Sequence, residues 1–238
     1  MALETNRKYM TRTQAEAALI DVGLREHMLR VYNYMASGLA LTGIIAYLVA
    51  SSEAAVQMIF GTGLFWIVAL APLGLVLFLS FRIQHMRAST AQAVFWIYAA
   101  LMGLSLASIF LQFTGASVAR VFFITAGTFA AMSLYGYTTK RDLAAVGSFL
   151  FMGLIGIVIA SVVNIFLASS MLHFVISVVG VVVFTGLTAW DTQKIKEMYV
   201  AAEDGEISGK KAIMGALTLY LDFINLFIML MNLMGERR

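Results

Sequence analysis

Two aspartates lie in strongly apolar sequence near the C-terminus, and they are the residues best placed to do chemistry. Asp191 follows the sixth apolar run, in the sequence WDTQKI, and Asp222 lies inside the seventh, in LYLDFINLF. An ionisable side chain inside a membrane span is energetically expensive, so intramembrane carboxylates usually mark an ion or proton path. Asp222 lies about ten residues into its predicted span, at a depth of about 15 Å. Asp191 taken alone would be an interfacial residue at a helix end.

The spacing of the two aspartates indicates that they lie at similar depth. The segment AAEDGEISG between them offers Gly205 and Gly209 as turn residues. A reversal near residues 205–208 would place Asp191 opposite Asp222 in an antiparallel helix pair. Two carboxylates in contact cannot both ionise at low cost, so the pair would titrate as a unit and act as a pH sensor. Contact between the side chains depends on helix rotation, which the sequence leaves open.

Three further polar residues are candidates for supporting roles. Asn225 and Tyr220 lie within one helical turn of Asp222 and would orient it, although Tyr220 is equally interpretable as an ordinary aromatic residue of the bundle. Arg82 ends the second apolar run. It is either a stop-transfer charge or a latch that bridges to one aspartate and closes a cytoplasmic gate.

The composition is that of an all-α polytopic membrane protein. Of its 238 residues, 61% are hydrophobic and 12% are charged, whereas a soluble domain carries about 25% charged residues. Every span is predicted to be helical, because lipid offers no water to satisfy an open backbone. The chain has no cysteine, which excludes disulfides and thiol chemistry. No phosphate-binding loop, serine elbow or paired-histidine motif indicates an enzyme, and nothing predicts a tightly bound cofactor or a nucleic-acid partner.

The apolar runs predict a single membrane domain over residues 31–238, preceded by an arm. The arm, residues 1–30, either forms an amphipathic helix on the membrane face over 13–29 or is solvated. Gly156 and Ala160 are spaced to allow close helix packing. Runs of about 20 apolar residues are long enough to span the hydrocarbon core, and they place seven spans at about 31–52, 54–81, 91–113, 121–137, 144–167, 171–190 and 212–234.

Lysine and arginine counts predict a cytoplasmic N-terminus. The arm and alternate loops carry 13 basic residues, and the opposite side carries three. A full seventh span then places the C-terminus outside. A re-entrant last segment would place it inside and would make the split 15 to one. The length of the final apolar run favours the full span.

Three sequence motifs resemble those of the transmembrane Bax inhibitor motif family (Bax inhibitor-1-like), in its bacterial branch. WDTQKI (190–195) resembles the end of the family's sixth helix, and LYLDFINLF (219–227) its seventh helix. LSFRI (79–83) resembles the segment around the second-helix arginine. The resemblance extends from about Leu29 onward. It departs from some bacterial relatives in having no acidic residue in the second span.

The resemblance implies a seven-transmembrane-helix bundle with the C-terminal helix at its centre, in the bacterial inner membrane. It also implies a pH-sensitive calcium leak in which Asp191 and Asp222 are the sensing pair and Arg82 is the latch. Calcium prefers six to eight oxygen ligands, so two aspartates would hold it weakly and transiently, with Asn225, Tyr220, backbone carbonyls or water completing the shell. We therefore expect a passive, pH-regulated cation conductance, with calcium as the permeant ion rather than a cofactor.

A second hypothesis is a non-conducting regulator that binds a membrane protease or other membrane proteins, since the resemblance implies such an association for some bacterial members. In that case the purified protein would carry no ions. Both hypotheses have the lipid bilayer as a partner, and both leave the oligomeric state open.

Overall fold

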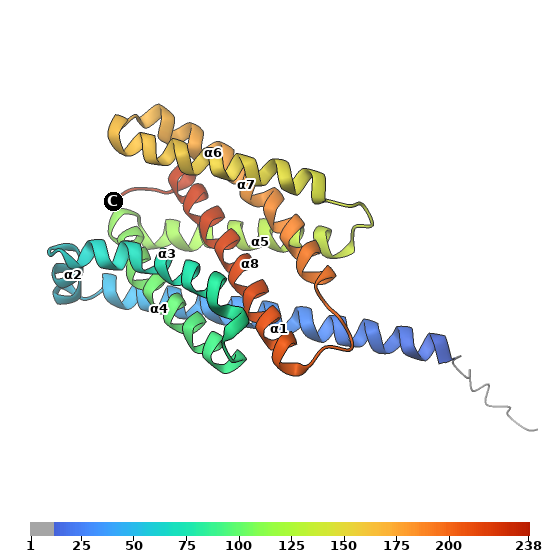
Figure 1. The fold of residues 1–238 in the computed structure, drawn as a ribbon. Helices are drawn as coiled ribbons and strands as arrows, with labels where there is room; N and C mark the ends of the chain where they lie inside the picture. Colours follow the sequence, from blue (N-terminus) through green and yellow to red (C-terminus); the bar gives the residue numbers. More distant parts are fainter. Residues whose placement is uncertain (1–11) are drawn as a thin grey trace, which may run out of the picture.

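The chain folds as a helical bundle. The computed structural model describes residues 12–238, with side chains from residue 22 onward. Seven of the helices in this part are long and apolar enough to cross a membrane, which confirms the predicted all-α polytopic architecture (Figure 1). The helices are α1 (Arg12–Ala50), α2 (Glu53–Phe60), α3 (Leu64–Arg82), the short 3₁₀ helix η1 (Ile83–His85), α4 (Ala88–Gln112), α5 (Gly115–Thr138), α6 (Ala144–Leu167), α7 (Ser170–Glu197) and α8 (Gly205–Met234).

The C-terminal helix α8 is the centre of the bundle, as the family resemblance implies. It packs against α1, α4, α5 and α7, and in Figure 1 it runs diagonally through the middle of the bundle. In its most apolar stretch 67% of the residues are buried, compared with 11% for α6. Asp222, which lies in this stretch, is therefore inside the protein and not in contact with lipid.

The first helix is longer than the span predicted from residue 31. It is continuous from Arg12 to Ala50, a length of 39 residues or about 58 Å. The hydrocarbon core is about 30 Å thick, so the N-terminal part of α1 projects beyond the bundle (Figure 1). No break in the helix separates the predicted arm from the first span. Residues 1–11 of that arm lie outside the described residues.

The second apolar run, predicted as one span over 54–81, is divided into two helices. The helix is interrupted at residues 61–63, between α2 and α3. The Ser52 side chain caps α2 by accepting a hydrogen bond from Ala55 N (3.3 Å), and Thr62 Oγ1 accepts one from Leu64 N (3.2 Å). The eight residues of α2 are too few to cross a membrane, so α3 alone is the second span.

The predicted position of the α7–α8 turn is wrong. Helix α7 continues to Glu197, and Gly205, predicted as a turn residue, is the first residue of α8. Favourable end charges explain the difference. Lys194 and Lys196 lie in the last turn of α7, where cations complement the helix dipole. At the start of α8, the Asp204 side chain accepts a hydrogen bond from the Glu206 N–H.

The C-terminus lies at the opposite end of the bundle from the α7–α8 loop. Thr114 N donates to Glu236 O and Arg238 N donates to Gln112 O, each at 3.0 Å, so the tail is held against the α4–α5 turn. Helix α8 therefore runs the full height of the bundle, which agrees with a complete seventh span and not with a re-entrant segment.

Glycines allow α7 to approach its neighbours closely. A Cβ on Gly136 of α5 would overlap the Ala189 carbonyl, and one on Gly147 of α6 would overlap the Trp190 indole. Gly156, the glycine that the sequence predicted to serve this purpose, has no neighbouring atom within 4 Å of the corresponding position. The close contacts of α7 thus lie beside Asp191, where they hold this part of the helix in place.

Candidate functional site

The two predicted aspartates are brought into contact. Asp191 lies within α7 and Asp222 within α8. Both residues are buried, with only 8% and 5% of their surface exposed. The two carboxyl groups lie close enough to interact electrostatically. Two ionised carboxylates in a buried place repel each other, so a proton on one of them relieves the repulsion. The arrangement is therefore suited to holding one proton between α7 and α8.

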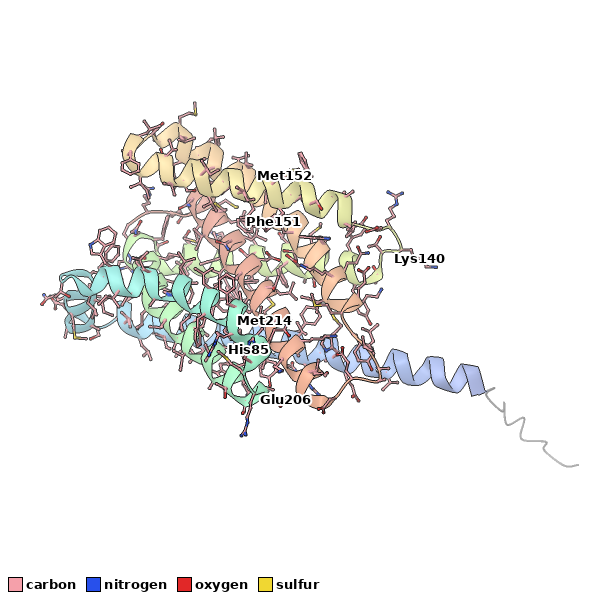
Figure 2. The ribbon with its side chains drawn as sticks, in the orientation of Figure 1. His85, Lys140, Phe151, Met152, Glu206 and Met214 are labelled. Atoms are coloured by element: carbon pink, nitrogen blue, oxygen red, sulfur yellow. The ribbon has the colours of Figure 1, made fainter. Side chains whose placement is uncertain are left out.

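The pair faces a cavity of about 320 Å³ between α6, α7 and α8. Asp222 Oδ2 has no hydrogen-bond partner among the described residues, although buried polar atoms in proteins are nearly always paired. Most of the cavity wall is apolar, and Phe151 of α6, labelled in Figure 2, contributes to it. The remaining lining residues are Leu154, Phe184, Leu187, Trp190, Lys194, Thr218, Leu221 and Asn225.

Lys194 is the basic residue at this cavity, and it was not among the predicted site residues. It follows Asp191 by one helical turn, the spacing at which side chains on a helix interact. Its ammonium lies 5.1 Å from the centroid of the Trp190 ring, and its side chain is exposed. The signal in the sequence is the spacing D-T-Q-K, which places a lysine about one helical turn after Asp191.

Asn225, predicted to support Asp222, lies on the lining of the same cavity. Its Nδ2 donates to the Leu221 carbonyl at 2.9 Å, which leaves the amide oxygen as an acceptor on a residue that lines the cavity. Together with the two carboxyl groups this provides oxygen ligands, the type that calcium prefers. No group of three or more His, Cys, Asp or Glu residues suited to a metal occurs in the described residues.

Tyr220, predicted to support Asp222, faces a different part of the bundle. It is completely buried, and its hydroxyl forms a 2.7 Å hydrogen bond with Thr42 Oγ1 of α1. Its ring packs edge-on against Phe95 and Tyr98 of α4. Although Tyr220 is within one helical turn of Asp222, it lies on a different side of α8 from Asp222 and Asn225. Tyr220 is therefore a packing residue that joins α8 to α1 and α4.

Arg82, predicted as the latch, is not brought to the aspartate pair. It is exposed at the end of α3, and α3 packs chiefly against α4 and not against α7 or α8. Arg82 forms no ion pair with Asp191 or Asp222 in the described part of the chain, where the ion pairs are Arg120 with Glu236 and Lys211 with Glu203. In this conformation Arg82 fits the alternative hypothesis, in which it is a stop-transfer charge at the end of a span.

The sequence is similar to proteins of one family over nearly its whole length. Residues 24–238 match the family described as "Inhibitor of apoptosis-promoting Bax1". A protein of Rickettsia prowazekii is 53% identical over 226 residues, which are 95% of this chain and 96% of the relative. The inner membrane protein YbhL of Escherichia coli K12 is 50% identical over 219 residues, which are 91% of this chain and 94% of YbhL.

These matches cover both aspartates and all the spans around them. A protein of Caulobacter vibrioides extends the similarity to 98% of both chains at 44% identity. The seven-helix bundle, its central C-terminal helix and the matched residues agree with one another, and the chain belongs to the Bax inhibitor-1-like family of membrane proteins.

Proposed function

We propose that this protein is a passive, pH-regulated cation conductance of the inner membrane, with calcium as the principal permeant ion. The observation that carries the proposal is the pair of carboxyl groups that meet beside an internal cavity, where Asp222 Oδ2 has no hydrogen-bond partner. The inner-membrane location is supported by the seven apolar helices and by the similarity to the inner membrane protein YbhL of E. coli.

The pair would couple proton binding to cation passage. When one of the two carboxyl groups carries a proton, the like-charge repulsion across the α7–α8 interface is removed. When the proton is lost, two like charges face each other in a buried place, which costs free energy unless a cation enters or the helices separate. Protonation thereby shifts the population between two forms of the bundle.

The ligands available favour permeation over storage. Calcium takes six to eight oxygens in stable sites, whereas the cavity offers two carboxyl groups and the Asn225 amide oxygen. A cation held by so few protein groups keeps much of its water and leaves readily. In this proposal Lys194 is the charge that limits cation occupancy, and a role for Arg82 would require α3 to move toward α7.

The test is calcium flux into liposomes that contain the purified protein and a trapped calcium dye, between about pH 5 and pH 8, the range over which a shared proton would be exchanged. We expect pH-dependent flux for the native chain and loss of that dependence in Asp191→Asn and Asp222→Asn. Asp142→Asn, which alters an exposed carboxylate in the α5–α6 loop, is the matched control and retains it.

Absence of flux above empty liposomes at every pH would overturn the conductance. The non-conducting regulator would then be the better explanation, and co-purification of a membrane protease with the native chain would support it. Flux that is unchanged in both aspartate variants would instead remove the pair from the ion path.

A further inference from the structure

A second crevice, separate from the aspartate cavity, lies between α1 and α5. Both helices pack against α8, but they make little direct contact with each other. The space between them has a volume of about 540 Å³. Its walls are mainly carbon, with Met28, Leu29 and Tyr32 from α1 and Phe129, Leu134 and Tyr137 from α5.

The polar groups at the bottom of this crevice already have partners. The Tyr32 hydroxyl and Ser133 Oγ are 2.5 Å apart, and Ser133 Oγ lies 3.0 Å from Thr192 Oγ1 of α7. Thr192 Oγ1 in turn donates to the Thr188 carbonyl at 2.7 Å. With these groups satisfied, the crevice offers an apolar surface and requires no polar group from a ligand at this depth.

One cationic side chain lines an end of the crevice, and a second contacts a residue of the lining. Arg25 is the lining residue, and Lys196 contacts Tyr137. Lys196 donates from Nζ to the Tyr137 carbonyl at 2.8 Å and lies 5.3 Å from the centroid of the Tyr137 ring. An ammonium has three donors, so Lys196 retains two after this bond. The charged end of the crevice is also the end of the bundle that carries the α5–α6 loop, where Lys140 is labelled in Figure 2.

An apolar slot with cations at one end complements an amphiphile with an acyl chain and an anionic head. We propose that the crevice binds one anionic phospholipid, with an acyl chain between α1 and α5 and the phosphate between Arg25 and Lys196. Basic pockets between transmembrane helices bind anionic head groups in this way, and a guanidinium matches the geometry of a phosphate. The site lies outside the aspartate cavity and does not depend on the proposed conductance.

The test is native mass spectrometry of the full chain in detergent with equal amounts of phosphatidylglycerol and phosphatidylcholine that carry the same acyl chains. We expect one phosphatidylglycerol to be retained in preference to phosphatidylcholine. A basic residue near an anionic surface contributes about 1 kcal/mol, or about fivefold in affinity. Arg25→Gln should therefore lower retention about fivefold, whereas Lys140→Gln, which removes an exposed charge outside the crevice, should leave it unchanged.

The acyl-chain half of the site has its own pair of variants. Ala130 lines the crevice and Ala131, beside it on α5, is exposed but does not. Ala130→Phe should fill the slot and abolish retention, and Ala131→Phe should behave as the native chain. Equal retention of both lipids by the native chain, or unchanged retention in Ala130→Phe, would overturn the proposal. Both phenylalanine variants must first be shown to have the same unfolding temperature as the native chain, so that a loss of binding reports on the site.

Discussion

Asp191 and Asp222 meet across the α7–α8 interface, and each is more than nine-tenths buried. The loop that joins their helices, residues 198–204, does not by itself set this contact, because the predicted turn residue Gly205 already belongs to α8. Close packing at Gly136 and Gly147 fixes α7 beside the pair. The contact is thus a product of the whole bundle.

The carboxyl pair should show the infrared signature of a shared proton. Because protonation of one carboxyl group removes the repulsion between the two, the native chain should display the C=O stretching band of a protonated carboxyl as the pH is lowered. Asp222→Asn carries no charge that repels Asp191, so this band should be lost, while Asp142→Asn should retain it. An identical band in the native chain and in Asp222→Asn would contradict the shared proton.

Removal of the positive charge at the cavity should increase calcium flux. Lys194 lies on the cavity lining close to Asp191, and a unit charge several ångströms from a divalent cation in a partly hydrated site costs about 1 kcal/mol or more. We expect Lys194→Gln to raise the initial rate of calcium entry into liposomes a few-fold. Lys140→Gln, at the same end of the bundle, is the control, and an equal rise in that variant would mean that only surface potential has changed.

The Tyr220 hydroxyl should contribute to stability and not to conductance. Tyr220→Phe removes the hydrogen bond to Thr42, while Thr42 Oγ1 can still donate to the Ala99 carbonyl at 2.8 Å. We expect a loss of about 1 kcal/mol in the free energy of unfolding, measured by thermal unfolding in detergent, with calcium flux preserved. Tyr135→Phe, at an exposed position, should have no effect on unfolding. Loss of flux at native stability would return Tyr220 to the ion path.

Substitution by alanine should have different effects on protein stability at two glycines of α6. Gly147→Ala places a methyl group against the Trp190 indole and should destabilise the protein by about 1–3 kcal/mol. Gly156→Ala meets open space and should be neutral or should stabilise the helix by up to about 1 kcal/mol. Thermal unfolding of both variants checks this, and equal effects would contradict the close α6–α7 packing.

Single cysteines in this cysteine-free chain should report the orientation in the membrane. Positive charge counts predict that Lys140→Cys faces the cytoplasm, so a membrane-impermeant maleimide should label it only after the cells are permeabilised. Ser51→Cys and Arg237→Cys lie at the opposite end of the bundle and should be labelled in intact cells. If Lys140→Cys were the only one of the three variants labelled in intact cells, the protein would have the opposite orientation to the predicted one.

Much of the architecture follows from local sequence. The cost of placing charge or open backbone in hydrocarbon acts residue by residue, so apolar runs revealed seven spans and their order, and Asp222 stood out as an intramembrane carboxylate. Helix ends were less predictable. The apolar run ended at Trp190, but α7 continues to Glu197, since charged residues at helix ends are stabilised by the helix dipole and by water.

Contacts between side chains were decided only by the tertiary structure. Which side of α8 faces which neighbour depends on helix rotation and crossing, and these are set by packing among helices far apart in the sequence. Packing turned Asp222 and Asn225 toward the cavity and Tyr220 toward Thr42. It also placed Lys194 at the pair and left Arg82 exposed on α3. The sequence alone thus identified the two carboxyl groups, and the packing of seven helices around α8 determined that they meet.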